Sequence, residues 1–286
     1  MKDLLEDLLF SGISELFCQF AHDIKNSKTT ILLTAPPDII GVLSLAPLEA
    51  SLLDANISYR RRFTKKPNEY GPSINITNSD ESSGPFLDSN TNSLFLSDLI
   101  VDGLTGTFGN SKKGPLTTIS QAHALAQKIC PSSPRLRKLR PWILSGNWLD
   151  DSLDNTYDPV FSKLKDILKN EGSIRIVPIT EVNLPYMENL TWIDKKYFKE
   201  IVANWPNLNF KEKSNSLSIL AKPVLNQNLP STARAEELIW NRILGPGWDT
   251  DIAGQIYFQI IKWNKNKEIF TSMELLDDLL KNGVLN

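Results

Sequence analysis

The fold is decided by the stretch Thr30-Ile31-Leu32-Leu33-Thr34-Ala35-Pro36-Pro37-Asp38 and by the apolar run that follows it over residues 39–53. The first five residues form a short apolar run that ends shortly before a proline pair, which is typical of a buried strand. Asp38 is a residue type that caps helix N-termini, so the run that follows it predicts a helix. Pro47 lies inside this run and is expected to kink the helix or divide it in two.

Segments on either side extend this strand-helix pair into a larger sheet. Apolar residues recur at helical spacing over residues 4–20, which predicts one long amphipathic helix before the first strand. After the central helix, strands are predicted at 57–63 and 73–77. The order helix, strand, helix, strand, strand indicates an α/β fold with a mostly parallel sheet flanked by helices.

The rest of the sequence predicts further helices and a second, smaller set of strands. We expect loops at 78–92 and 106–115, a strand or short helix at 94–104, and helices at 118–129, 136–149 with a break at Pro141, and 160–169. After Gly172 we expect strands at 174–177 and 217–221, helices at 194–205, 233–244 and 272–281, and a strand or helix at 252–263. Ser272 is the expected N-cap of the last helix and Gly283 its stop. Residues 1–172 are thus expected to form one α/β domain and residues 173–286 a smaller α/β lobe.

Composition limits the kind of chemistry that the chain can carry. The 286 residues contain 31 Lys and Arg against 33 Asp and Glu, so nucleic acid can be bound only through local patches and not through bulk charge. The two cysteines exclude a disulfide framework, and the two histidines exclude a His-rich metal centre. Acidic residues interrupt the apolar pattern of the N-terminus, so we expect no signal peptide and a cytoplasmic protein.

The common catalytic patterns do not stand out. Gly103, Gly106 and Gly109 have the wrong spacing for a phosphate-binding loop, and a flexible loop is the preferred interpretation. His22 and His123 lie in helical segments without a motif around them, so neither carries a mechanism by itself. Paired carboxylates are plentiful and are interpreted as surface groups or helix caps, although a magnesium site made of carboxylates alone stays open. No cofactor and no metal ligand is assigned.

Two basic runs and one aromatic cluster are the candidate binding residues. The basic runs are Arg60, Arg61, Arg62, Lys65 and Lys66 in the first and Arg135, Arg137, Lys138 and Arg140 in the second. Such clusters contact a phosphate backbone or an acidic partner surface, with a solvated face as the alternative. The aromatic candidates for partner binding are Trp240, Trp248, Tyr257 and Phe258, which would otherwise fill the core of the second lobe.

Residues 32–44, Leu-Leu-Thr-Ala-Pro-Pro-Asp-Ile-Ile-Gly-Val-Leu-Ser, resemble the first motif of the DHH phosphoesterase superfamily, which includes the RecJ exonucleases. That motif is a strand ending in His-x-Asp-x-Asp-Gly and followed by a helix. Asp38 and Gly41 hold their places here, whereas Pro36 replaces the histidine and Ile40 the second aspartate. Asp80 follows a strand where the family carries a metal-binding aspartate. The resemblance covers residues 30–150, but the Asp-His-His triplet is absent from the sequence.

The resemblance implies a RecJ-like fold from which most ligands of the family's two-metal site have been lost. The Gly-Gly-His signature of the family's second domain is also missing after Gly172. Degenerate proteins of this kind act as scaffolds of the replicative helicase in archaea and eukaryotes. The resemblance therefore implies an inactive scaffold that binds GINS and MCM replisome subunits, with single-stranded DNA as an additional candidate ligand and no membrane association. The alternatives are an active metal-dependent phosphoesterase or nuclease and an unrelated α/β adaptor protein.

Overall fold

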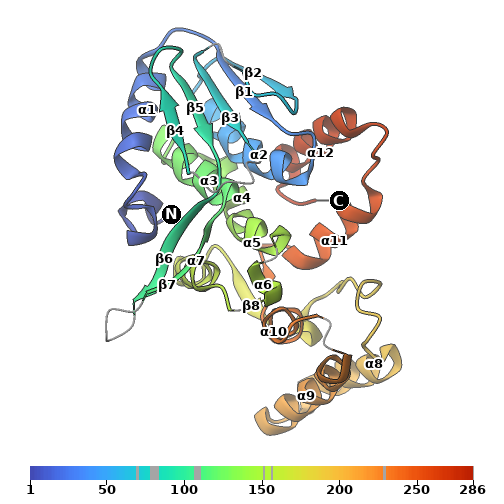
Figure 1. The fold of residues 1–286 in the computed structure, drawn as a ribbon. Helices are drawn as coiled ribbons and strands as arrows, with labels where there is room; N and C mark the ends of the chain where they lie inside the picture. Colours follow the sequence, from blue (N-terminus) through green and yellow to red (C-terminus); the bar gives the residue numbers. More distant parts are fainter. Residues whose placement is uncertain are drawn as a thin grey trace.

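The computed structural model describes residues 1–68, 71–77, 84–105, 111–150, 152–155, 157–227 and 230–285. Its N-terminal half contains a five-stranded sheet with helices against one face (Figure 1). The elements up to the end of this sheet are η1 (Leu4–Glu6), η2 (Leu8–Phe10), α1 (Ser14–Asn26), β1 (Ile31–Ala35), α2 (Ile39–Asp54), β2 (Tyr59–Phe63), β3 (Ser73–Ile76), β4 (Phe86–Asp88) and β5 (Ser93–Leu96).

The sheet is mostly parallel, which confirms the predicted α/β class. Its strand order is β2-β1-β3-β5-β4, and only β4 runs antiparallel to its neighbour. The register aligns Leu33 of β1 with Arg61 of β2 and with Ile74 of β3. Side chains that are aligned in this way point to the same face of the sheet. Leu33, Arg61 and Ile74 therefore face the helices, whereas Arg60 and Arg62 face the other side.

The strand-helix pair at residues 31–54 forms as the sequence predicts. Asp38 caps α2 with its side chain, and α2 is buried on almost every side because it lies between the sheet, α3 and α12. Pro47 is accommodated within α2, so the predicted division of this helix in two is not observed. The predicted opening helix is wrong in its first half, where Asp3 and Asp7 each cap a short 3-10 turn instead.

The middle of the chain forms a hairpin and a series of short helices. These elements are β6 (Leu99–Thr105), β7 (Ser111–Leu116), α3 (Thr118–Ile129), α4 (Pro134–Leu139), η3 (Arg140–Leu144), α5 (Ser145–Leu149), α6 (Ser152–Asn155) and α7 (Pro159–Asn170). Strand β7 replaces the second half of the predicted loop 106–115, because it pairs with β6, an interaction that local sequence does not reveal. The predicted break at Pro141 is confirmed, since α4 ends before it.

The C-terminal part is mainly helical and returns to the sheet. Its elements are β8 (Arg175–Val177), η4 (Ile179–Glu181), α8 (Lys195–Asn204), η5 (Trp205–Asn207), α9 (Phe210–Gln227), α10 (Thr232–Ile239), β9 (Arg242–Leu244), α11 (Ile252–Lys262) and α12 (Glu268–Asn282). Helices α8 and α9 lie far from the sheet, whereas α12 packs on α2, α4 and β2 (Figure 1). The proposed boundary near Gly172 stays a prediction.

Three predictions in this part need correction. Residues 217–221 are helical and not a strand, because Leu217, Leu220 and Val224 are buried at helical spacing. Residues 242–244 form a strand antiparallel to β8 instead of the end of a helix. Ser272 lies inside α12 and bonds to the Glu268 carbonyl, whereas Gly283 ends the helix with a φ of 79° as predicted.

Candidate functional site

The carboxyl ends of β1, β2, β3 and β5 meet at one edge of the sheet. In open α/β sheets, ligands bind in the crevice at this edge. Here β1 leads to Pro36 and Asp38, and β5 leads to Ser97 and Asp98. This edge is therefore the first place to look for chemistry, and it carries the motif that resembles the DHH superfamily.

Asp38 and Gly41 both have structural tasks at this edge. Asp38 Oδ1 accepts a hydrogen bond from the Gly41 backbone N–H at 2.7 Å, which caps the first turn of α2. A Cβ at Gly41 would lie 2.1 Å from the Pro36 carbonyl oxygen, so only glycine fits this close approach. Asp38 and Gly41 thus shape the turn between strand and helix. Asp80, the third proposed motif residue, lies outside the described residues.

Asp98 is a further carboxylate at this edge that sequence analysis missed. Its Oδ1 accepts a hydrogen bond of 2.7 Å from the backbone N–H of Thr118 at the start of α3. Burial raises the pKa of Asp98, the Thr118 hydrogen bond opposes this, and the nearby Asp150 carboxylate raises it further. In the sequence, Asp98 is marked by a polar pair directly after an apolar strand. This pair does not stand out when residues 94–104 are interpreted as one element.

Catalysis at this edge would require further chemical groups around Asp38 and Asp98. Within the described ranges, no three His, Cys, Asp or Glu side chains gather so as to hold a metal ion. His123 is completely buried within α3, and His22 is exposed on α1, where it contacts Asn26. We find no base or nucleophile triad among the described side chains at this edge.

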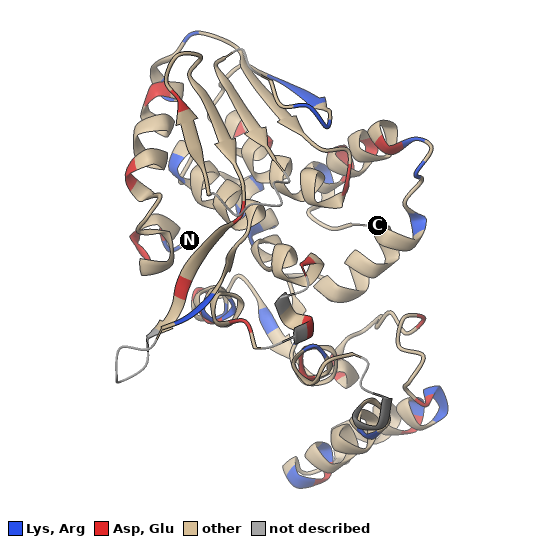
Figure 2. Ribbon diagram, in the orientation of Figure 1, with Lys and Arg blue, Asp and Glu red and all other residues tan. Residues whose placement is uncertain are grey.

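The first basic run is divided by the alternation of β2. Arg60 and Arg62 are exposed, whereas Arg61 reaches Glu49 of α2 at 3.4 Å and Asp277 of α12 at 2.6 Å. Lys65 lies 3.8 Å from Glu268, the residue that begins α12. Figure 2 shows this basic strand at the margin of the sheet. The structure therefore splits the predicted patch into exposed cations and cations already paired with the protein's own carboxylates.

Glu49 is the most perturbed carboxyl group near this run. Its side chain is buried on α2, and its Oε2 accepts a 3.0 Å hydrogen bond from the Tyr59 hydroxyl. Burial raises the pKa of Glu49 to about 7, although the neighbouring Arg61 cation and the Tyr59 hydroxyl oppose the shift. A buried, protonatable group thus connects α2 to β2 and, through Arg61, to α12.

The second basic run is divided in the same way. Arg140 is fully buried, where it pairs with Glu171 at 2.8 Å and donates to the Lys2 carbonyl, so it is not available to an outside phosphate group. Arg135 pairs with Asp54 of α2. Arg137 and Lys138 are exposed, and neither forms an ion pair with a described residue. Helix α12 contacts both β2 and α4, the elements in which the two runs begin.

The four aromatic candidates differ in exposure. Trp248 is buried and packs on Trp142 with a centroid distance of 4.9 Å, so it belongs to the core. Trp240, Tyr257 and Phe258 are half-buried. Each of these three rings lines a different cavity, of about 500, 610 and 580 Å³ respectively.

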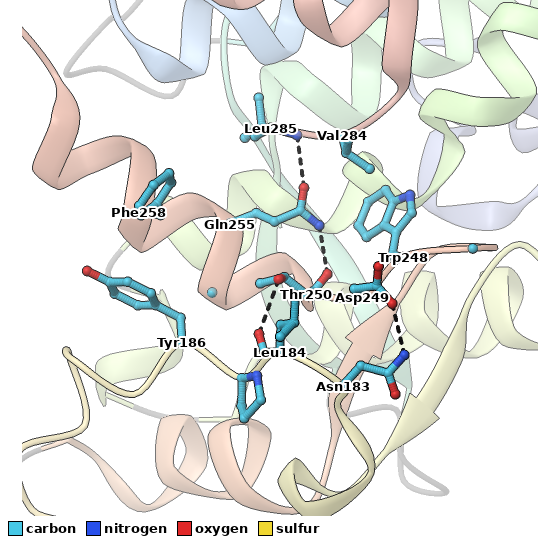
Figure 3. A pocket seen from close by; sticks show the side chains of 13 residues that line it. Asn183, Leu184, Tyr186, Trp248, Asp249, Thr250, Gln255, Phe258, Val284 and Leu285 are labelled. Atoms are coloured by element: carbon cyan, nitrogen blue, oxygen red, sulfur yellow. Dashed lines mark hydrogen bonds between the residues drawn. The ribbon is translucent and has the colours of Figure 1, made fainter.

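Figure 3 shows the cavity that Phe258 lines together with Tyr186 and Trp248. The Gln255 amide holds its wall together, donating to the Thr250 carbonyl at 2.7 Å and accepting from the Leu285 N–H at 2.9 Å. The Asn183 amide also donates to the Asp249 carboxylate at 2.9 Å, so hydrogen-bonded polar groups line this cavity beside the rings. Large exposed apolar side chains lie on the same helix and at the start of the next one, namely Ile260, Ile261, Ile269, Phe270 and Met273.

Comparison of the sequence with models of known protein families finds no match, and comparison with curated proteins finds none either. No helix in the described ranges is both long and apolar enough to span a bilayer.

Proposed function

We propose that this chain is a catalytically inactive RecJ-like protein that serves as a scaffold of the archaeal replicative helicase. Its proposed partners are GINS and, in the same assembly, MCM. The proposal rests on the resemblance of residues 32–44 to the DHH motif. The observation that carries its inactive character is the turn at Asp38, where the retained aspartate caps α2 while Pro36 and Ile40 occupy the other ligand positions.

Helix α11 and the start of α12 are the proposed docking surface for the protein partner. Interfaces combine apolar anchors with a polar rim, and aromatic residues are enriched among the anchors. Tyr257 and Phe258 line cavities on this helix, and Ile261 and Phe270 are 65% and 57% exposed. A monomeric protein exposes few such residues together, so this part of the surface is the one that a partner would cover.

A capture experiment with purified GINS tests the scaffold function. The full chain should retain GINS, and the variant Ile261→Asp with Phe270→Asp should lose most of this binding. The matched control is Ile219→Asp on α9, because Ile219 is 53% exposed but lies on a different helix. Failure of the wild-type chain to bind GINS would contradict the scaffold proposal.

A phosphoesterase that uses carboxylates alone is the second candidate, because Asp98 and Asp150 lie close enough to interact. A single-stranded oligonucleotide incubated with the chain and manganese distinguishes the two functions. The scaffold proposal expects no cleavage and no tight manganese binding by calorimetry. Cleavage that disappears in Asp98→Asn would instead establish the enzyme.

DNA contact is a further part of the proposed function. Five of the nine proposed contact residues are exposed and unpaired within the described ranges: Arg60, Arg62, Lys66, Arg137 and Lys138. Binding through such cations would be salt-sensitive and of about micromolar affinity or weaker.

A further inference from the structure

Strand β2 ends the sheet on one side. Its only strand neighbour among the described residues is β1. The Ser58 carbonyl and the Thr64 N–H form hydrogen bonds to β1 of 2.9 and 2.7 Å, respectively. In a parallel pair, alternate residues direct their main-chain groups to the same neighbour. The main-chain groups of Tyr59 and Arg61 are therefore directed away from β1, at the margin of the sheet in Figure 1, whereas the next residue of this set, Phe63, is buried.

The side chains beside this edge carry uncompensated positive charge. Arg60 and Arg62 are exposed on one face of β2, and Lys66 is exposed shortly after the strand. None of the three forms an ion pair with a described residue, in contrast to Arg61 and Lys65. Two residues of a strand span about 7 Å, so Arg60 and Arg62 match acidic side chains at alternate positions of another extended chain.

The surroundings favour a polypeptide over a nucleic acid. Proteins that bind single strands without sequence preference combine cations along the backbone with rings on which bases stack, and the rings strengthen the binding. The rings of β2 itself are turned away from this face: Tyr59 bonds to Glu49 and Phe63 is buried. The stacked pair Phe86–Phe95 lies on β4 and β5, which β1 and β3 separate from β2. An open strand edge, in contrast, offers main-chain hydrogen bonds that a peptide can use.

We propose that the edge of β2 binds an acidic, extended segment of a partner protein as an additional strand, with its carboxylates facing Arg60 and Arg62. Main-chain pairing would supply part of the affinity, and the alternating acidic side chains would set its position along β2. The inference rests on the proposed scaffold function for the nature of the partner. The competing explanation is that the arginines only prevent association between sheet edges.

A fluorescent peptide of four Thr-Glu repeats, titrated against the full chain and followed by anisotropy, tests this inference. Binding should weaken about tenfold in the variant Arg60→Glu with Arg62→Glu. The matched control, Arg137→Glu with Lys138→Glu, changes two exposed cations on α4 and should keep wild-type affinity. Because all four positions are exposed, thermal unfolding should show unchanged stability in both variants.

Two further probes separate strand addition from general charge attraction. A peptide with an N-methyl group on every residue has no main-chain N–H donor on either edge and should bind at least tenfold more weakly. A thymidine octanucleotide should bind more weakly than the peptide. Equal binding of the N-methylated peptide, tighter binding of the oligonucleotide, or no peptide binding would each overturn the inference.

The same variants separate this inference from the scaffold function. If GINS is retained by the wild-type chain but the acidic peptide does not bind, the β2 edge is not a docking site and the scaffold proposal stands. If the peptide binds in the expected way but GINS is not retained, the edge is a docking site for another acidic partner and the scaffold proposal fails.

Discussion

Acid should destabilise this protein through His123. The imidazole is completely buried in α3, and within the described residues neither ring nitrogen has a hydrogen-bond partner. Burial, and secondarily the Arg140 cation, hold the pKa of His123 well below its usual value of 6.5. The folded chain therefore keeps this ring neutral at a pH at which the unfolded chain protonates it.

The magnitude follows from the linkage between protonation and folding. The contribution of His123 is fully present above pH 6.5 and is lost as the pH falls below this value, by about 1.4 kcal/mol per pH unit. Between pH 6.5 and pH 5, this amounts to about 2 kcal/mol of unfolding free energy. The variant His123→Met lacks the titratable group and fills a similar volume, so it should lose less stability than the wild type over this range.

Urea unfolding followed by tryptophan fluorescence at pH 7 and pH 5 measures the effect. The drop in unfolding free energy from pH 7 to pH 5 should be about 2 kcal/mol larger in the wild type than in His123→Met. Comparing the two chains removes the contributions of all other titrating groups. An equal drop in both chains would show that His123 is protonated in the fold or is not buried.

Three further predictions concern α2 and its first turn. Because the pKa of Glu49 is raised to about 7, protonation of this group should stabilise the fold as the pH falls from 7 towards 4.5, which is opposite in sign to the effect of His123. Glu49→Gln should remove about 3 kcal/mol of this gain in unfolding free energy. An unchanged pH profile of urea unfolding in this variant would refute the assignment. Asp38→Ala should cost about 1 kcal/mol in the same assay and Asp38→Asn much less, whereas equal costs would argue against capping. Gly41→Ala should cost about 2–3 kcal/mol because its Cβ meets the Pro36 carbonyl, whereas Gly12→Ala, with open space around it, should leave the unfolding midpoint nearly unchanged.

Local signals predicted the first part of the fold well. The strand before Pro36 and the helix after Asp38 form as expected because a break and a cap lie next to each other in the sequence. The helix at 118–129 is also confirmed, with Thr117 as its cap. The failures occur where pairing partners are distant, as for β7 within a glycine-rich segment and for β9 against β8.

The environment of individual site residues was much less predictable. The arginine run on β2 was recognised as a cluster, but its division into paired and exposed residues depends on Glu49 and Asp277, which are 12 and 216 positions away from Arg61. Asp98 accepts a hydrogen bond from Thr118, the first residue of α3, and its pKa is raised by Asp150, which follows α5. Both residues lie well after Asp98 in the sequence. Charge runs in a sequence therefore indicate where cations lie but not which of them remain free.

The Arg61 contacts also bear on how the two parts of the chain depend on each other. One guanidinium bridges α2, in the first 172 residues, and α12, near the end of the chain. Helix α12 also buries Leu275, Leu276 and Leu279, and the Trp142 indole donates to the Gly283 carbonyl at 2.9 Å. Without α12, the apolar surface of α2 and the Glu49 carboxyl group would be left with fewer protein contacts. A division near Gly172 therefore separates two segments of sequence whose packing is shared, and α12 belongs structurally with the sheet that the first segment builds.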